Sequence, residues 1–320
     1  MRLTDGEEER GERKEATRSV KKPVRRRSKV NLKTQITAWL IMLPGIILFG
    51  FFVWWPLLQS VHMSLYKTKN VELVSFIGFE NYIKVLQRDD FLQALQNTLS
   101  YTFWSLVIGF LIPIIMALVI GETVRGKGLF RTAAYLPNIL PGLAAVLLWK
   151  AFFSAESTGV VNILLGKLGI APMAYLSEAN LVIPLIVITA TWKGAGATAL
   201  IYMAGLSGIN PELYEATAID GASIWKRIRH ITLPAIFNLG STLLILQIIS
   251  IFQIMYEPMV LTAGGPDNAS LSLMLLMWRY AFGGTMDFGR ASAVAVIISL
   301  ILLVFTGLYT IVNKRKTDWE

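Results

Sequence analysis

Long runs of hydrophobic residues, separated by shorter polar stretches, dominate the pattern along this chain. A helix needs about 20 predominantly apolar residues to cross the hydrocarbon core of a bilayer. Runs close to or above that length occur at 36–61, 97–121, 132–153, 181–203, 237–256 and 291–312. The pattern therefore predicts an all-α membrane protein with six transmembrane helices.

Two of these runs contain a lysine. Lys150 lies near one end of its run, where a long side chain can carry its charge to the polar boundary. Lys193 lies in the middle of the fourth run, beside Gly194 and Gly196, which makes this run the weakest of the six. A charge at that depth is costly and typically faces a cavity or a partner. Lys193 is thus either a polar group on a transport path or a structural feature. In the second case the span begins later, or Lys193 pairs with a carboxylate from another chain.

The composition agrees with a membrane protein and excludes several kinds of chemistry. Hydrophobic residues make up 54% of the chain and charged residues only 16%, against about 25% in soluble domains. The absence of cysteine excludes disulfides, thiol catalysis and cysteine metal sites, and two histidines, His62 and His230, exclude a histidine-rich site.

The basic residues predict the orientation. Eight of them, with no acidic residue, lie within 18–33, directly before the first apolar run. Such a flank is typical of a cytoplasmic membrane end attracted to anionic lipid, so the net charge of +9 does not indicate nucleic-acid binding. With both termini inside, the inner segments 1–33, 122–131, 204–236 and 313–320 hold 21 of the 30 lysines and arginines.

Residues 1–33 are predicted to be a basic cytoplasmic tail, followed by a transmembrane domain over 34–316. Residues 1–31 carry six acids and eleven bases among few apolar residues, a composition typical of disorder. The first apolar run is too long for a signal-peptide core and lacks a following cleavage site, so we expect it to be a retained anchor.

Two outer segments have recognisable patterns. The spacing of Tyr82, Val85 and Leu86 predicts a short surface helix. The loop 257–290 contains the turn-rich "LTAGGPDNAS" and then the apolar "LSLMLLMW", which is too short to span a bilayer. We expect an external lid there, in preference to a re-entrant segment.

Two short motifs do not support chemistry. Residues 121–128 fit seven positions of a phosphate-binding P-loop, but Gly128 replaces the required hydroxyl and no buried strand precedes it. A basic turn at an inner membrane end explains the segment. Residues 205–208, "GLSG", match an intramembrane serine-protease signature, but neither histidine is placed to activate Ser207.

The loop 204–236 predicts two short helices at the membrane surface. Asn210 and Pro211 have the form of an N-cap and a first helical residue. Gly221 ends this first helix, residues 222–230 form a second helix with a basic face, and Pro234 starts another. Such an element can lie on the membrane, read DNA, or dock into a soluble partner. Its glutamates, alanines and glycine turn favour docking, and a short loop anchored at both ends offers no DNA-recognition domain.

This loop resembles the EAA loop of permease subunits in binding-protein-dependent ABC importers. The pattern Glu-Ala-Ala, three residues, Gly, nine residues, Ile-x-Leu-Pro falls on 215–217, Gly221 and 231–234, with Thr217 as the single departure. "FIGFENY" and "VLTAGGPDNAS" resemble the carbohydrate branch, with its maltose-type and glycerol-phosphate-type permeases. The resemblance covers about 36–316.

The resemblance implies a transport subunit and not an enzyme, in a bacterial-type cytoplasmic membrane. A second permease, which can be identical or different, two cytoplasmic ATPases that bind ATP and Mg²⁺, and an extracytoplasmic binding protein would be its partners. The chain itself would hold no cofactor or metal. The residues expected to couple it to the ATPases are Glu215, Ala216, Thr217, Asp220, Gly221, Leu233 and Pro234.

The expected substrate is a sugar, with an oligosaccharide preferred. Sugars bind to aromatic faces and hydrogen-bonding groups, and the fifth run carries such groups at helical spacing, with Glu257 just beyond it. The candidates for the substrate path are Gln247, Ser250, Gln253, Tyr256, Trp192 and Lys193. Hydrogen bonds between helices are an equal alternative for the polar groups.

A stand-alone secondary transporter of a small polar solute is the alternative function. It would need ionisable residues at mid-membrane and internal repeats. Only Lys193 meets the first requirement, and no repeat is evident.

Overall fold

The computed structural model describes residues 32–317 except 124 and 285, and it leaves the side chains at 32, 34 and 314–317 undescribed. The chain divides into two compact units, Met1–Pro56 and Leu57–Glu320. Almost all of the predicted tail lies outside the described residues, so its disorder stays a prediction.

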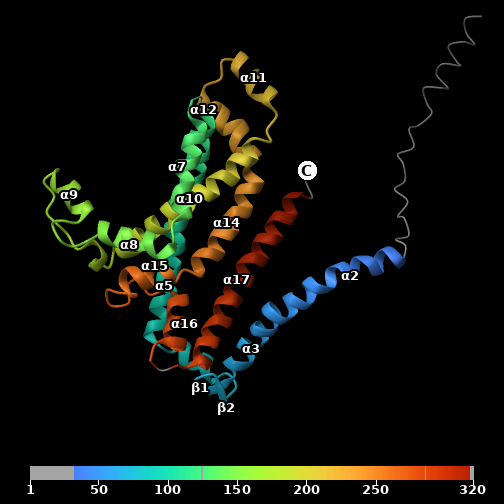
Figure 1. Cartoon of the computed structure of the whole chain (residues 1–320), viewed down its shortest axis with the longest axis vertical. Coiled ribbons are helices and arrows are strands. Elements are labelled where there is room, and N and C mark those ends of the chain that lie inside the picture. Colours follow the sequence, from blue (N-terminus) through green and yellow to red (C-terminus); the bar gives the residue numbers. More distant parts are fainter. Residues whose placement is uncertain (1–31, 124, 285, 318–320) are drawn as a thin grey trace, which may run out of the picture. The chain divides into compact units, whose positions relative to one another are not determined.

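The described chain is mostly helical (Figure 1). It begins with α2 (Leu32–Phe49), a π-helical turn η1 (Gly50–Trp54) and α3 (Trp55–Ser64). Together these form one apolar helix, Gln35–Ser64, and no residue of its most apolar window is buried within the chain. Such a surface suits a helix surrounded by lipid, and its bounds agree with the first predicted span.

Three more helices are long and apolar enough to cross a membrane. One runs from Asp89 to Glu122, and the others lie within α10 and α17. Their elements are α5 (Asp89–Trp104), η2 (Ser105–Gly109), α6 (Leu111–Glu122), α10 (Val182–Leu206) and α17 (Phe288–Thr317). They confirm the second, fourth and sixth apolar runs as long helices.

The third predicted span is not one helix. It consists of α7 (Lys127–Ile139) and α8 (Gly142–Phe152), which meet at 96°. Leu140 between them is extended, with φ −61° and ψ 138°. The reason is Pro141, because a residue that precedes proline is pushed out of the helical region. The prediction of a single helix over 132–153 was therefore wrong.

The fifth predicted span is shorter than expected and follows a second bend. The helix Ile224–Ala235 meets α14 (Phe237–Phe252) at 68°. The chain leaves α14 at Gln253 and begins α15 (Tyr256–Thr262), so the predicted end at Tyr256 was wrong. The described residues thus hold four unbroken candidate spans, or six if each bent pair is counted as one.

The π-helical turns in these helices each lie shortly before a proline. Pro56, Pro113 and Pro234 each follow such a turn within a few residues. Proline has no amide hydrogen for the carbonyl four residues earlier, which for Pro113 is that of Gly109 at the end of η2. Within η2 the bonding reaches the fifth residue, as in Phe110 N–H to Ser105 C=O at 2.8 Å. Pro234 lies in the first turn of α13, as predicted for a helix start, but α13 closes the helix Ile224–Ala235 and a bend of 68° separates it from the fifth span.

The loop 204–236 has the predicted succession of short helices. The first is α11 (Pro211–Ile219), and a helix over Ile224–Ala235 follows after Gly221. This second helix comprises α12 (Ile224–Arg227), η4 (Ile228–Thr232) and α13 (Leu233–Ala235).

A small β-hairpin and an isolated parallel bridge between Asn70 and Asp287 depart from an all-α fold. Strands β1 (Tyr66–Lys69) and β2 (Glu72–Phe76) pair antiparallel. The side-chain amide of Asn81, on α4 (Glu80–Leu86), donates to the carbonyls of Ser64 and Tyr66 at 2.9 and 2.8 Å. Helix α4 confirms the predicted surface helix, and its amide fixes the hairpin to the end of α3.

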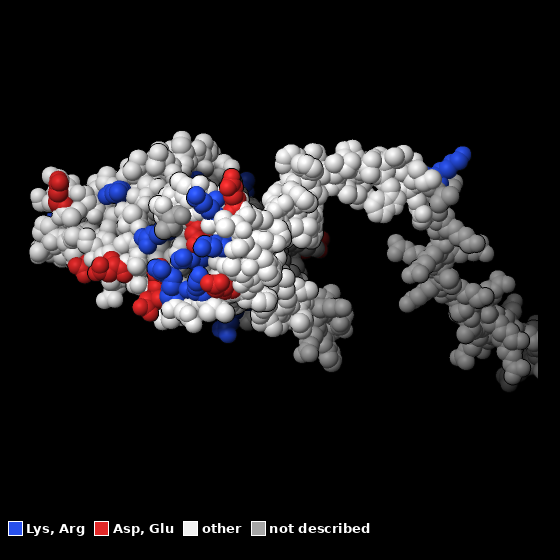
Figure 2. Space-filling model, turned by 90° about the horizontal axis from the view of Figure 1, so that it is seen from below, with Lys and Arg blue, Asp and Glu red and all other residues white. Residues whose placement is uncertain are grey.

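Charged residues of both signs gather at the end of the second unit that carries the hairpin, as Figure 2 shows. Ion pairs join Lys84 to Glu80, Arg88 to Asp90 and Arg290 to Asp287, at 2.6, 2.8 and 2.9 Å. This mixed, exposed charge marks a water-facing end of the helices.

The apolar stretch 271–278 forms part of a buried helix. Helix α16 (Leu273–Phe282) packs along α17, and Leu273, Leu275 and Leu276 are buried with Phe91 of α5. Two further cores join α5, α8, α10 and α14, and α6, α10 and the end of the 204–236 loop. A peripheral helix, α9 (Val160–Gly166), and a short 3-10 turn, η3 (Tyr175–Ser177), complete the chain between α8 and α10.

Candidate functional site

The first candidate site is the loop 204–236, whose local structure follows from its sequence. The side chain of Asn210 accepts a hydrogen bond from the Glu212 amide at 3.1 Å, and Pro211 occupies the first helical turn. Helix α11 ends at Asp220, and Gly221 adopts φ +68°. This left-handed conformation costs a residue with a Cβ about 1–2 kcal/mol. The predicted helix, glycine turn and second helix are confirmed.

Side-chain contacts fix this loop to the helices beside it. Tyr214 of α11 and Thr232 of the next helix share a hydrogen bond of 3.0 Å between their hydroxyls. Arg227 makes an ion pair of 3.0 Å with Glu122, the last residue of α6. A force applied to α11 would therefore be transmitted to the helix ends.

The predicted coupling residues present an exposed surface on this framework. Glu215, Ala216 and Asp220 are exposed on and after α11, and Leu233 and Pro234 are exposed on α13. Within the described residues, the Glu215 carboxylate has no hydrogen bond or ion pair. It is therefore available to a group outside this chain.

Thr217, the departure from the EAA pattern, faces inward more than its neighbours. It is half-buried, and its hydroxyl donates to the Tyr214 carbonyl at 2.9 Å. The threonine therefore fits the helix without leaving a buried polar group unsatisfied.

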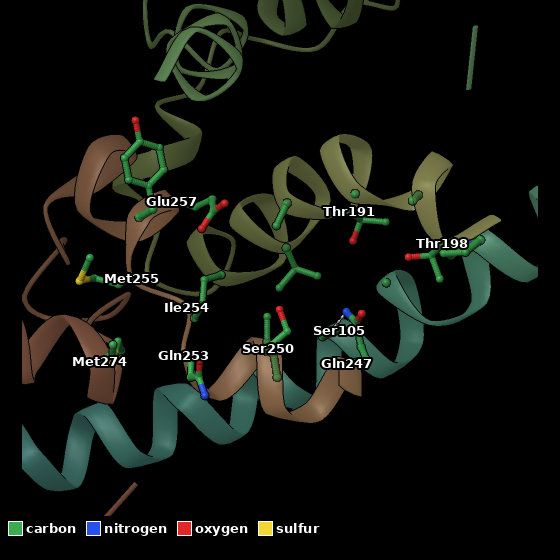
Figure 3. Close-up of a pocket in the computed structure, with 18 residues that line it drawn as sticks. Ser105, Thr191, Thr198, Gln247, Ser250, Gln253, Ile254, Met255, Glu257 and Met274 are labelled. Carbon is green, nitrogen blue, oxygen red and sulfur yellow. Dashed lines mark hydrogen bonds between the residues drawn. The ribbon is translucent and has the colours of Figure 1, made fainter. Parts of the chain in front are cut away.

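The second candidate site is a cavity of about 440 Å³ among η2, α10, α14 and α15. The polar residues predicted along the fifth run all line it, and Figure 3 shows several of them around one space. These residues are Gln247, Ser250, Gln253 and Tyr256, and Glu257, just beyond the run, lines the cavity with them.

The opposite sides of the cavity add further polar groups. Ser105 and Gly109 come from η2, and Thr191 and Thr198 come from α10. The Gln247 amide donates to the Ser105 hydroxyl at 2.6 Å, which is drawn in Figure 3. A Cβ on Gly109 would lie 2.8 Å from that amide nitrogen. Glycine at this position therefore leaves room for Gln247.

A carboxyl and an aromatic ring lie at the α15 end of this cavity. Glu257 lies in the first turn of α15, beyond the end of α14, and burial raises the pKa of its carboxyl, while the charge of Lys193 opposes that rise. The ring of Tyr256 approaches Gly142, where an added Cβ would lie 3.5 Å from it. Amide, hydroxyl, carboxyl and aromatic groups around one space can bind a polyhydroxylated ligand.

Two of the predicted path residues do not line this cavity. Trp192 of α10 packs against Trp149 of α8, with ring centroids 5.7 Å apart. Lys193 is half-buried, and its charge opposes the rise in the pKa of Glu257. Their proposed contact with substrate stays a prediction.

Ser105, Thr191 and Thr198 line the cavity and were missed in the sequence. A signal for the α10 pair was present, because Val187, Thr191, Gly194 and Thr198 recur every three or four residues and share one helix face. Ser105 offered no such pattern, since its partner Gln247 lies 142 residues away.

The family comparison identifies the chain over most of its length. Residues 109–318 match the family described as "Binding-protein-dependent transport system inner membrane component".

Individual relatives agree with this family. The trehalose/maltose transport system permease protein MalF of Thermococcus litoralis is 30% identical over 91% of this chain and 98% of its own length. The lactose transport system permease protein LacF of Rhizobium radiobacter is 31% identical over the same shares. The arabinooligosaccharides transport system permease protein AraP of Bacillus subtilis is 30% identical over 83% of this chain and 85% of its own.

Solved structures share the fold. A chain of a bacterial ABC transporter involved in the import of the acidic polysaccharide alginate superposes with a TM-score of 0.78 at 28% identity, over 88% of this chain and 96% of that one. A second structure, of the bacterial alginate transporter in complex with an alginate pentasaccharide-bound periplasmic protein, gives a TM-score of 0.79. The fold, the family match and the relatives agree, and the chain belongs to the inner membrane components of binding-protein-dependent transport systems.

Proposed function

We propose that this chain is a permease subunit of an ATP-driven importer for an oligosaccharide. The observation that carries the substrate class is that relatives named for trehalose/maltose, lactose and arabino-oligosaccharides match most of the chain at 30–31% identity. The cavity lined by Gln247, Ser250 and Glu257 offers hydrogen-bonding groups together with the Tyr256 ring. This combination suits the binding of a sugar.

The proposed topology has six spans over 34–316, with both termini in the cytoplasm of a bacterial-type cell. Each bent helix pair then counts as one span. Two observations support this arrangement. The 204–236 loop and the hairpin lie at opposite ends of the second unit (Figure 1), and basic residues concentrate in the segments assigned to the inside. Residues 1–33 would form a cytoplasmic tail.

The proposed partners follow from the family. A second homologous permease would complete the path, and an extracytoplasmic binding protein would deliver the sugar. The solved alginate transporter was crystallised with such a periplasmic protein carrying an alginate pentasaccharide. Two separate cytoplasmic ATPases would bind ATP and Mg²⁺.

The 204–236 loop would couple those ATPases to the spans. The exposed Glu215 would meet a basic residue in the ATPase, and Gly221 would hold the angle between the two short helices. The Tyr214–Thr232 and Arg227–Glu122 contacts would pass the movement to the span ends. Ala216, Thr217, Asp220, Leu233 and Pro234 would shape the rest of the docking surface.

The substrate class is tested by ATPase activity. The chain is assembled with its partner permease, ATPases and binding protein, and a panel of oligosaccharides, monosaccharides, glycerol phosphate and amino acids is added. We expect an oligosaccharide to stimulate ATP hydrolysis most strongly. Stimulation by amino acids alone would contradict the proposal.

A further inference from the structure

A second polar cavity lies where the 204–236 loop meets the helix ends. It has a volume of about 400 Å³ and is lined by the end of α6, the start of α7, the end of α10 and parts of α11, α12 and η4. Three basic side chains line it, Lys127, Arg131 and Arg227, together with one acidic side chain, Glu122. The cavity therefore carries an excess of two positive charges.

The hydrogen bonds within this cavity leave part of its donor capacity unused. The Nε atoms of Arg131 and Arg227 are buried and, within the described residues, have no hydrogen-bond partner. Arg227 bonds to Glu122 through Nη2 alone. A buried donor without an acceptor is unfavourable, so both guanidinium groups would gain from an acceptor placed between them.

Neutral donors complete the lining. The hydroxyls of Tyr214 and Thr232 bond to each other at 3.0 Å. Only one of the two can donate in that bond, so the hydrogen of the other remains available. Lys127 has a bond of 3.0 Å from Nζ to the Gly121 carbonyl, and an ammonium group has two further hydrogens.

We propose that this cavity binds an anion with a phosphate group. A guanidinium matches phosphate oxygens with its planar fork of donors, and two guanidiniums, an ammonium and a hydroxyl surround one space here. The site is not a P-loop, because Gly128 lacks the hydroxyl that coordinates Mg²⁺ and a helix, not a strand, precedes Gly121. The proposed anion site is separate from the exposed surface around Glu215 and from the cavity lined by Gln247.

A bound anion at this position would connect the 204–236 loop to helix α7. Arg131 belongs to α7, and Arg227 belongs to the helix that follows α11. An anion held by both would tie the 204–236 loop to a neighbouring helix end, beside the Arg227–Glu122 ion pair. Bound anion therefore stiffens the link between the loop and the helices.

The test uses the full chain, stripped of lipid in an uncharged detergent. Thermal unfolding is followed by tryptophan fluorescence while inorganic phosphate replaces chloride at constant ionic strength. A parallel titration uses a short-chain phosphatidylglycerol, with phosphatidylcholine as its neutral counterpart. We expect Tm to rise with one or both anions, and the Arg131→Gln variant to need about tenfold more anion for the same rise, the loss expected from one charge-assisted contact.

The matched control is Arg125→Gln, which removes the same charge from an exposed arginine in the neighbouring turn, outside the cavity. Its response should stay within about twofold of the wild type. If Arg131→Gln does not fold, Glu122→Gln gives the opposite test, because removing the competing carboxylate should lower the anion concentration required.

The outcomes separate the sources of the phosphate group. A response to inorganic phosphate identifies a soluble anion, and a response to phosphatidylglycerol alone identifies a lipid headgroup, provided that Arg131→Gln weakens it. Failure of both anions to raise Tm, or an equal loss in the Arg131 and Arg125 variants, would overturn the proposal.

Discussion

At the scale of single residues, the two candidate sites use polar groups in opposite ways. Glu215 is exposed, and within the described part of the chain its carboxylate has no hydrogen bond or ion pair. Because water can solvate it, the carboxylate does not destabilise the fold, and it is available to a partner. Gln247 lies inside a helix that apolar residues dominate, and its amide bonds Ser105 at 2.6 Å. We expect loss of the Glu215 carboxylate to affect binding to another protein, whereas loss of the Gln247 amide leaves the Ser105 hydroxyl without its partner at the cavity.

Replacing Glu215 with alanine should uncouple the importer without unfolding this chain. An exposed substitution away from special features changes stability by about 0.5 kcal/mol or less, whereas a hydrogen bond to a charged group contributes about 1.5–3 kcal/mol. We expect sugar-stimulated ATP hydrolysis in proteoliposomes to fall by about tenfold or more, with an unchanged Tm.

The control is Glu212→Ala on the same helix, because the Glu212 carboxylate already has an intrachain partner in the Asn210 amide at 3.2 Å. A Glu215→Ala importer that keeps its full stimulation would contradict the assigned role.

Replacing Gln247 with leucine should weaken sugar transport. The change removes an amide from the cavity and leaves the Ser105 hydroxyl without its partner. At about 0.5–1.5 kcal/mol per hydrogen bond, the substrate concentration for half-maximal uptake should rise roughly threefold to tenfold. Leu246→Ala, at an exposed neighbouring position, should leave that concentration unchanged. Equal effects of the two substitutions would show that the cavity is not on the path.

At the scale of elements, prolines decide where these apolar helices bend or change their bonding. Pro141 separates α7 from α8, and Pro113 follows the π turn η2 that places Ser105 and Gly109 at the cavity lined by Gln247. A π turn within an α-helix is frequent at functional positions. Breaks in the helical pattern thus shape the cavity.

Close approach of helices α7 and α10 depends on Gly196. A Cβ at this position would lie 1.8 Å from the backbone oxygen of Ala134, so Gly196→Ala must push the two helices apart. We expect a loss of about 1–3 kcal/mol, as for other overpacked interiors, seen as a lower Tm in detergent. Gly194→Ala is the control, because nothing lies within 4 Å of its added Cβ. Equal stability of the two variants would contradict this packing.

The sequence predicted the elements better than their shapes. Hydrophobic runs located the long helices because burial in lipid depends on composition, and helical spacing located Gln247, Ser250 and Gln253 on one face. The break at Pro141 was missed because hydropathy carries no information about backbone angles. The pairing of Gln247 with Ser105 was missed because it depends on how distant helices pack.

At the scale of the whole molecule, the second unit has two different ends. One carries the hairpin and a surface of mixed charge (Figure 2), and the other carries α11 and α12. An importer needs such a division, because the binding protein and the ATPases act on opposite sides of the membrane.

The absence of cysteine from the chain makes this topology directly testable. Ser75→Cys on β2 and Ala218→Cys on α11 both introduce a thiol at an exposed position. In intact spheroplasts, a membrane-impermeant maleimide should label the first variant, and it should label the second only after permeabilisation. Labelling of the Ala218 variant from outside would reverse the proposed orientation.

Uptake by reconstituted vesicles tests the central claim most directly, namely that this subunit moves sugar only when a separate ATPase drives it. Accumulation of a radiolabelled oligosaccharide is measured with both permeases, the binding protein and Mg²⁺-ATP, with and without the ATPase subunits. The account predicts accumulation with the ATPases and none without them, even under an imposed proton or sodium gradient. Gradient-driven accumulation by this chain in the absence of any ATPase would contradict it.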